Sequence, residues 1–335
     1  MSDPSFPPAC DKRKERGAAL LTVLLLVAVM AVVAAASLDR LILATRLSGN
    51  ASALGQARAY ADSTHLIVQQ RLADLVAAQP GKVTLQGGWM GRAQPLPVPG
   101  GTATVTVYDA GNCFNLNSLV AGLSEDNMKV RPVAVEQFVT LMQLLGVPAG
   151  KARAIAVASA DWIDSDAVPQ AGGAEDETYM AANPSYRAAN RMMVDTSEMR
   201  AVAGVTPAIY NLLQPWICAL PTNNLSPINV NTLLPGQAPL FAMLVPGKLS
   251  LGSARDMLAA RREGGYDSTI SFWAAPALRG LTPPAEVAQQ VRLTTTWFGA
   301  ELNVNLGGTH MRQWALYDAQ SQQVKLVRRS WGEKP

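Results

Sequence analysis

The sequence predicts an α+β protein in which one long N-terminal α-helix packs on a small antiparallel sheet and a large α-helical block interrupts that sheet. Three observations lead to this fold class. An apolar run near the N-terminus continues as a helical pattern for about 60 residues before the first strong stop signal. Segments rich in β-branched residues stand on both sides of a mainly helical region. The first group of strands is too small to bury a core alone, so one interrupted sheet is favoured over two domains.

The composition narrows the classes of function. The chain has 335 residues, 49% of them hydrophobic, which is enough for one large core or two modest ones. Its net charge of only +3 gives no strong field toward nucleic acid or an acidic partner. The two histidines, His65 and His310, are far apart and lack ligand spacing. A zinc site and a histidine-based catalytic triad are therefore not expected.

The N-terminal segment joins a basic leader to an apolar run of membrane-spanning length. The leader ends at Gly17, and the run extends from Ala18 to about Leu38. Only Thr22 and Ser37 interrupt it. About 20 apolar residues in a helix span about 30 Å, the hydrocarbon thickness of a bilayer. The cations before the run hold the N-terminus in the cytoplasm, which predicts a single-pass protein with the bulk of the chain outside it.

Three interpretations fit this segment. A secretory signal peptide would be cleaved after the run, where residues 34–36 are all alanine. A plain anchor would not be cleaved. A type IV prepilin would be cleaved before the run, and the basic leader ending at Gly17 resembles that class. The third interpretation is favoured because the helical pattern continues to about Gln79, which makes roughly 90 Å of helix, far more than a bilayer requires.

The remaining elements are predicted from periodicity and turn residues. Strands are expected at 82–86 and 102–108 before the helical block, and at 293–297, 301–306, 311–317 and 323–328 after it. Helices are expected at 133–145, 149–162, 196–203, 207–213 and 251–262. The sequence is thereby divided into a leader (1–17), a transmembrane and spine helix (18–79), first strands (80–110), an inserted helical domain (111–290) and closing strands (291–335).

The helical block shows weak internal repetition. Residues 113–119 resemble residues 227–233, and glycine separates helical patterns within 144–150 and 203–207. These units resemble helix-hairpin-helix motifs, in which glycine permits the tight turn. Such motifs often bind the DNA backbone, but residues 110–220 carry eleven acidic and seven basic residues. A phosphate-binding face needs a cationic stripe, so we expect the hairpins to serve packing and not nucleic acid.

An acidic cluster follows one of these helices. Asp161, Asp164 and Asp166 precede a Gly/Pro loop that returns Glu175 and Asp176. So many carboxylates repel one another unless they are solvated or bind a cation, and calcium takes six to eight oxygen ligands of this kind. The spacing is not that of an EF-hand loop. Three interpretations stay open: a calcium site, a solvated acidic loop, and a catalytic pair of carboxylates.

Cysteine usage suggests one bridge. Cys113 and Cys218 lie beyond the membrane segment, whereas Cys10 precedes it. In an oxidising compartment the first two could form a disulfide, and the alternative is two buried thiols.

Over nearly its whole length the sequence resembles the K-type minor pseudopilins of type II secretion systems, which belong to the type IV pilin-like superfamily. The resemblance is carried by the junction between Arg16-Gly17 and Ala18, and by four motifs: Cys-Phe-Asn-Leu-Asn at 113, Asp-Trp-Ile-Asp-Ser-Asp at 161 with Gly-Ala-Glu-Asp at 173, Ile-Asn-Val-Asn-Thr at 228, and Thr-Thr-Thr-Trp-Phe at 294.

The resemblance implies a pilin-like fold with a helical insertion, anchored in the bacterial inner membrane with its bulk in the periplasm. It implies cleavage after Gly17 and N-methylation of Ala18 by the prepilin peptidase. It also implies a calcium-binding helical domain, for which Asp161, Asp164, Asp166, Glu175 and Asp176 are the candidate ligands. The implied role is structural and not enzymatic: a subunit that joins other minor pseudopilins in a tip complex, helps start the pseudopilus and supports protein export across the outer membrane.

The fifth position after the junction supports a tip location. Most pilins carry glutamate there, where it can neutralise the N-terminal amine of a neighbouring subunit, but this protein has Thr22. A subunit with nothing above it has no amine to neutralise, and an unpaired carboxylate in an apolar environment is costly. Two alternative functions remain: a minor pilin of a DNA-uptake or twitching pilus, and a membrane-tethered periplasmic metal-dependent hydrolase.

Overall fold

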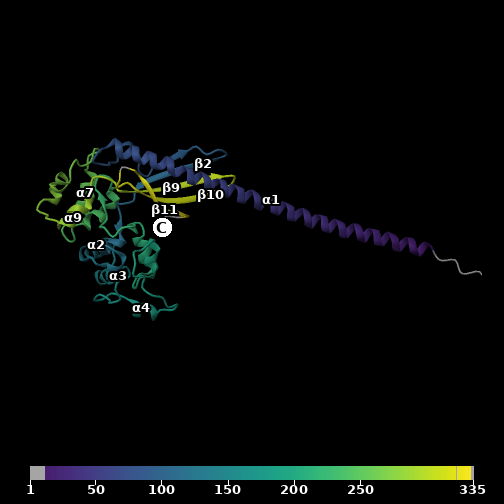
Figure 1. Ribbon diagram of the computed structural model, residues 1–335, viewed down its shortest axis with the longest axis horizontal. Coiled ribbons are helices and arrows are strands. Elements are labelled where there is room, and N and C mark those ends of the chain that lie inside the picture. The colour runs from purple at the N-terminus through teal and green to yellow at the C-terminus, as the bar shows by residue number, and fades with distance from the viewer. Residues whose placement is uncertain (1–11, 322, 333–335) are drawn as a thin grey trace, which may run out of the picture.

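The computed structural model describes residues 12–321 and 323–332. Helix α1 spans Lys12–Ala78, 67 residues, and at 1.5 Å per residue it is about 100 Å long. Its front half projects freely from the rest of the molecule, and its rear half lies along the sheet (Figure 1). The predicted helix to residue 79 is confirmed to within one residue. Of the predicted leader, residues 1–11 lie outside the described part of the protein.

The sheet contains five antiparallel strands in the order β1-β2-β9-β10-β11. These are β1 (Ala93–Leu96), β2 (Gly101–Asp109), β9 (Trp297–Leu306), β10 (Thr309–Asp318) and β11 (Lys325–Trp331). The central pairing joins strands from the two sides of the helical block, for example Val105 with Leu302. One interrupted sheet is therefore confirmed.

The rear half of α1 completes the core of this sheet. Ala57, Ala61, Val68 and Leu72 are buried on one side of the helix, together with alternate residues of β2 and β9. Small alanine side chains allow the helix to approach the strands closely. A buried hydrogen bond of 2.7 Å between His65 Nδ1 and the Tyr317 hydroxyl also ties the helix to β10.

Two predicted strands are wrong. Residues 82–86 form no strand; an irregular segment there leads into the 3₁₀ helix η1 (Gln86–Gly88). Thr84 bonds to the side chain of Gln79 through both its amide and its hydroxyl, and such local bonds compete with strand pairing. Residues 293–297 are also not a strand, since only β8 (Val291–Arg292) precedes a turn and β9 begins at Trp297. Strand β1 was not predicted, because Pro95 breaks the strand pattern in the sequence.

The helical block contains one large hydrophobic core, in which Phe114 and Phe138 stack with ring centroids 4.6 Å apart. Its α-helices are α2 (Pro132–Leu144), α3 (Ala149–Asp161), α4 (Asp176–Met180), α5 (Pro207–Leu213), α6 (Ala238–Ala242), α7 (Leu251–Ala259), α8 (Thr269–Trp273) and α9 (Ala285–Gln290). Its 3₁₀ helices are η2 (Leu116–Leu119), η3 (Glu125–Asn127), η4 (Thr196–Ala201), η5 (Pro235–Gln237) and η6 (Pro276–Leu278). Its short strands are β3 (Phe114–Asn115), β4 (Val120–Ala121), β5 (Lys129–Val130), β6 (Ile217–Cys218) and β7 (Ile228–Asn229).

Most of the predicted helices are present. Helices α2, α3 and α5 match the predictions to within one residue, and α7 ends three residues earlier than the predicted 262. The predicted helix at 196–203 is the 3₁₀ helix η4. Between α2 and α3, Gly146 adopts φ +95°, and its amide bonds to the Gln143 carbonyl to end the first helix. This left-handed conformation explains why glycine stands at that turn.

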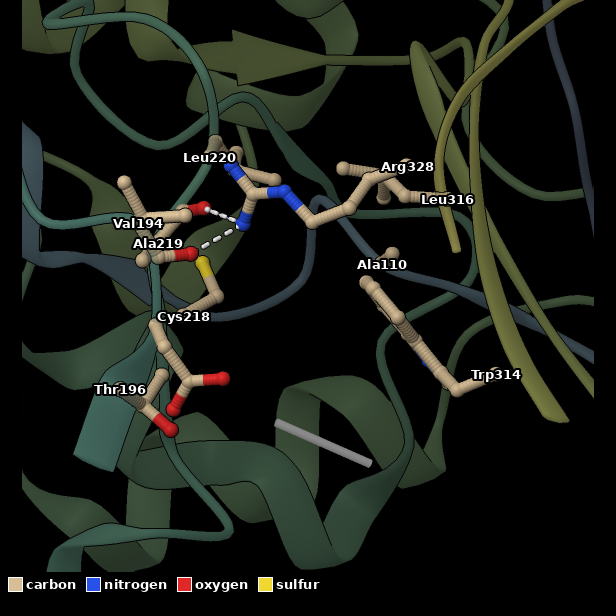
Figure 2. A pocket seen from close by; sticks show the side chains of 10 residues that line it. Ala110, Val194, Thr196, Cys218, Ala219, Leu220, Trp314, Leu316 and Arg328 are labelled. Carbon is tan, nitrogen blue, oxygen red and sulfur yellow. Dashed lines mark hydrogen bonds between the residues drawn. The ribbon is translucent and has the colours of Figure 1, made fainter. Parts of the chain in front are cut away.

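Two polar contacts fix the helical block to the sheet. At the end of β2, the buried Asp109 carboxylate accepts hydrogen bonds from the hydroxyls of Thr232 (2.7 Å) and Thr295 (2.5 Å). From β11, the Arg328 guanidinium donates to the carbonyls of Val194 and Ala219 (Figure 2). Residues far apart in the sequence are thereby held together at the junction.

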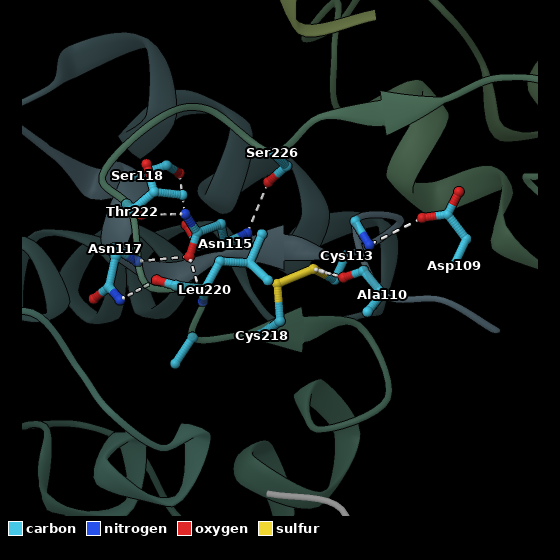
Figure 3. The surroundings of a disulfide bond; sticks show 12 residues. Asp109, Ala110, Cys113, Asn115, Asn117, Ser118, Cys218, Leu220, Thr222 and Ser226 are labelled. Atoms are coloured by element: carbon cyan, nitrogen blue, oxygen red, sulfur yellow. Dashed lines mark hydrogen bonds between the residues drawn. A yellow bond between two sulfur atoms is a disulfide. The ribbon is translucent and has the colours of Figure 1, made fainter. Parts of the chain in front are cut away.

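The structure joins Cys113 and Cys218 in a disulfide beside the paired strands β3 and β6 (Figure 3). Buried amide side chains surround it: that of Asn117 donates to the Leu220 carbonyl at 2.8 Å, and that of Asn115 donates to the Thr222 carbonyl at 2.8 Å. The bridge closes the segment of the protein that contains the acidic cluster.

Candidate functional site

Three carboxylates converge beyond the end of helix α3. Candidate ligand oxygens of Asp164, Asp166 and Glu175 all lie within 4.8 Å of one another. Asp164 and Asp166 belong to the turns that follow α3, and Glu175 is the residue before the first turn of α4. The backbone between them folds back over the end of the helix, so three residues spread over twelve positions share one site.

Most carboxylate oxygens of the two buried members of this cluster lack a hydrogen-bond donor. Asp164 is 1% exposed and Glu175 is 3% exposed. Asp164 Oδ1 and both carboxylate oxygens of Glu175 have no hydrogen-bond partner among the described residues. A buried carboxylate without a donor or a cation is costly, because it loses its hydration without compensation. These two carboxylates are therefore candidates for binding a cation.

The raised pKa values of two of these carboxyl groups also favour a bound cation. Burial, followed by the negative charges of Asp166, Asp161 and Glu175, raises the pKa of Asp164 to about 7. Burial, followed by the charges of Asp161 and Asp166, likewise raises the pKa of Glu175 to about 7. A bound cation would remove both the repulsion and the cost of burial.

Two of the five predicted ligands have other partners. Asp161 is fully buried, and its carboxylate accepts hydrogen bonds from the backbone amides of Gln170 and Ala174. Asp176 accepts from the Ala188 amide at 3.0 Å and forms an ion pair with Arg187 at 3.3 Å. Both residues therefore lie outside the group of three, and their carboxylates hold the loops that shape the site.

The Asp161 contact also explains a glycine in the loop. A Cβ atom added at Gly173 would lie 1.8 Å from Asp161 Oδ2, so only glycine allows the backbone to pass the carboxylate at this distance. Because the next amide, that of Ala174, bonds to the same oxygen at 2.9 Å, Gly173 and Asp161 together place Glu175 in the cluster.

Asn190 lies next to this cluster, although the sequence analysis did not predict it. Asn190 donates from Nδ2 to the backbone carbonyl of Asp166 at 3.1 Å, and its Oδ1 is buried without a partner in the described structure. Asn190 is tied by this hydrogen bond to the backbone of Asp166, one of the three grouped residues. Its only signal is the conformation, φ +46°, which the sequence does not reveal.

The residues present fit a hard cation. Carboxylate and amide oxygens are the donors that calcium prefers, and the group supplies no sulfur or imidazole for zinc. From the same stretch of sequence, Trp162, Tyr179 and Tyr186 form an aromatic cluster. Asp164, Asp166 and Glu175 thus form a possible metal-binding group.

The predicted processing residues lie at the other end of the molecule. Gly17, Ala18 and Thr22 are all exposed on the free front half of α1. The Thr22 hydroxyl donates to the Ala19 carbonyl at 2.8 Å, so this polar group is satisfied within the helix. Among the described residues, the stretch Gly17–Ala78 is the one helix whose length and composition suffice to cross a membrane.

Comparison with known proteins agrees with these features. Two models described as "Type II secretion system (T2SS), protein K" match residues 112–222 and 228–296. The type II secretion system protein K of Pectobacterium carotovorum is 33% identical, over 96% of this chain and 98% of its own length. The proteins of the same name from Klebsiella pneumoniae and Aeromonas hydrophila are 34% and 35% identical, over 95% and 91% of this chain and 97% and 92% of their own lengths.

A solved structure shows the same fold. The protein superimposes with a TM-score of 0.72 and 28% identity on one subunit of the GspK-GspI-GspJ complex of the enterotoxigenic Escherichia coli type 2 secretion system. The match covers 83% of this protein and 96% of that subunit. On the strength of the full-length relatives and this structure, the chain belongs to the type II secretion system protein K family.

Proposed function

We propose that this protein is a minor pseudopilin at the tip of the type II secretion pseudopilus, where it helps start assembly and supports protein export across the outer membrane. The observation that carries the proposal is the division of α1. In the front half, the apolar run 18–38 is fully exposed, whereas one side of the rear half is part of the sheet core. One continuous helix thus links a membrane-inserted segment to a folded periplasmic head, as a fibre subunit requires.

The exposed apolar surface on the front half of α1 must be shielded from water. In the inner membrane the lipid tails cover it, and in a fibre the front halves of neighbouring subunits would do so. Cleavage after Gly17 by the prepilin peptidase, with methylation of Ala18, would place a free N-terminus at the start of the apolar run. Thr22 then stands at the fifth position without a charge, which suits a subunit that has no neighbour above it.

The helical block favours the tip over the shaft. It widens the molecule at the end remote from the free half of α1 (Figure 1). A subunit stacked above this one would have to pass the block, so the block would stop growth on that side. The homologous subunit was solved together with GspI and GspJ, and we expect the corresponding minor pseudopilins to be the partners here.

We further propose that the cation of the acidic group is calcium. The candidate metal ligands are oxygens, and the site lies in the predicted periplasmic portion. A divalent cation would compensate the charge of the Asp164 and Glu175 oxygens that lack a hydrogen-bond partner. Calcium would fix the loop between α3 and α4, and so stabilise this side of the helical block.

A labelling experiment tests the tip location. Ile270 on α8 is 80% exposed, and after cleavage the mature protein has no cysteine except the bridged pair. An Ile270→Cys variant, expressed with the other pseudopilins in a strain that lacks its own protein K, is labelled with maleimide-linked gold on isolated fibres. Label at one end of each fibre is expected, and label along the shaft would refute the tip location.

A further inference from the structure

A polar cleft of about 340 Å³ lies where the helical block meets the sheet. Its walls come from the residue that precedes α2, the loop after β6, helix α9, strand β8 and the turn before β9. The polar side chains that line it include those of Arg131, Asn224, Glu286, Gln289, Arg292 and Thr296. None of them belongs to the acidic group or to the membrane helix.

The charges in the cleft favour an anion. Two arginines, Arg131 and Arg292, face one acid, Glu286. Arg131 is half-buried, and one nitrogen of its guanidinium donates a hydrogen bond to the Asn223 carbonyl at 3.0 Å. The other N–H groups of the guanidinium remain available to a ligand. Arg292 is exposed and makes no ion pair within the part of the protein that the structure describes.

The uncharged groups suit a polypeptide backbone. The Thr296 hydroxyl is buried and has no partner in the described ranges, although a buried hydroxyl normally has one. Asn224 and Gln289 are exposed, and each amide side chain can both donate to and accept from a peptide group. Guanidinium groups bind carboxylates through two parallel hydrogen bonds, which gives an arginine pair a preference for this anion.

The position of the cleft excludes a lipid headgroup as its ligand. Helix α9 lies at the end of the molecule remote from the free half of α1, a helix of about 100 Å (Figure 1). When the front half of α1 is in the bilayer, the cleft is therefore far from the membrane surface. A partner in the periplasm can reach it.

We infer that this cleft binds the carboxylate of an extended polypeptide segment from another protein, with Arg131 and Arg292 on the carboxylate and Thr296, Asn224 and Gln289 on the neighbouring peptide groups. The carboxylate can be that of an acidic side chain or that of a polypeptide's C-terminus. The inference does not depend on the tip location or on calcium.

Trp297 allows the cleft to be observed directly, because this buried side chain lines it. The full-length protein, labelled with 5-fluorotryptophan in detergent micelles, is followed by ¹⁹F NMR, and the Trp297 signal is assigned by its loss in Trp297→Phe. Three heptapeptides of glycine and serine are titrated: one with a central Glu and blocked ends, one with a central Gln and blocked ends, and one with a central Gln and a free C-terminal carboxylate. Free acetate is the control for the anion alone.

A saturable shift of the Trp297 signal is expected with at least one carboxylate peptide, at a dissociation constant of about 1 mM. Which of the two carboxylate peptides binds identifies the source of the anion. The blocked Gln peptide should bind at least roughly fivefold more weakly, because it lacks the charge-assisted bonds. No saturable shift, an equal response to the blocked Gln peptide, or an equal response to acetate would overturn the inference.

Variants of opposite sign separate binding from folding. Arg292→Gln should weaken binding roughly fivefold, whereas Glu286→Gln should strengthen it by about threefold, because it removes the repelling charge. Both residues are exposed, so neither change disturbs the core. Arg279→Gln, at an exposed arginine outside the cleft, is the charge-matched control and should change nothing. Equal affinities for all three variants would contradict the inference.

Discussion

Asp164 and Glu175 bring carboxylate oxygens within 4.8 Å of each other. Of the four oxygens on these two buried side chains, three have no hydrogen-bond donor in the described structure. Calcium in saturating excess should therefore raise the melting temperature of the full-length protein in detergent micelles, by about 5 °C relative to EDTA. The Asp164→Asn variant should lose this response. Its stability in EDTA should equal or exceed that of the parent protein, because the change removes a buried uncompensated charge.

Glu177→Gln is the matched control for that experiment. Glu177 is close in sequence to the cluster but exposed, and it is not one of the three grouped carboxylates. It should keep the full calcium response. A parent protein whose melting temperature is the same in calcium and EDTA would rule out the calcium site.

The junction between sheet and helical block should depend on pH through Asp109. Burial raises the pKa of this carboxyl to about 6, although hydrogen bonds from Thr295, Thr232 and the Gly111 amide oppose the shift. The folded state thus binds the proton more tightly than the unfolded state does. Its contribution to the unfolding free energy is present below pH 4 and is lost as the pH rises through 6.

The measurement compares the parent protein with Asp109→Asn, which does not titrate. The difference in unfolding free energy, parent minus variant, should fall by about 2 kcal/mol between pH 4 and pH 7. Taking the difference cancels the other titrating groups. A difference that stays constant or grows with pH would show that Asp109 does not have the raised pKa.

Arg328 and Arg329 are neighbours on β11, but their contributions to stability should differ. Arg328 is half-buried and donates to two backbone carbonyls of the helical block, whereas Arg329 forms a solvent-exposed ion pair with Asp62. Arg328→Ala removes two charge-assisted hydrogen bonds, one of them to the buried residue Ala219, and should lower the unfolding free energy by about 2 kcal/mol. Arg329→Ala should cost less than about 1 kcal/mol. Equal losses in urea unfolding would contradict the role given to Arg328.

Processing should depend on Gly17. A Gly17→Ala variant is expected to accumulate in membranes as the uncleaved precursor, which migrates more slowly on a gel than the mature protein. Gly49→Ala, a glycine-to-alanine change at an exposed position further along α1, should mature normally. Mature-sized protein from Gly17→Ala would count against cleavage at this position.

Much of the architecture could be predicted from the sequence because its signals are local. The absence of a breaker before Pro80 sets the end of α1. Alternating β-branched residues marked β2 and most of β9, and the small size of the first strand group indicated that they pair across the block. The error at 82–86 occurred where Thr84 bonds locally to the side chain of Gln79, which periodicity does not reveal. At 293–297 the backbone carbonyls accept from distant residues, among them Val83 and Ala319, so the tertiary packing sets this segment.

The acidic site was predictable only in outline. The density of carboxylates indicated a cation site, and three of the five predicted ligands do converge. The other two, Asp161 and Asp176, are not in this group, and backbone amides from later loops reach their oxygens. The contact between Asn190 and Asp166 was not predicted either, since the path of a loop after α4 brings the two together. Loop paths depend on tertiary packing, and spacing along the sequence carries little information about them.

The N-terminus of the mature protein, determined by mass spectrometry on material from bacterial membranes, tests the central claim most directly. A single unbroken helix that crosses the membrane and enters the folded head requires the apolar run to remain in the mature protein. The expected species begins with N-methylated Ala18. A species that begins near Ser37, without the apolar run, would contradict the account, and so would a protein that still carries its leader.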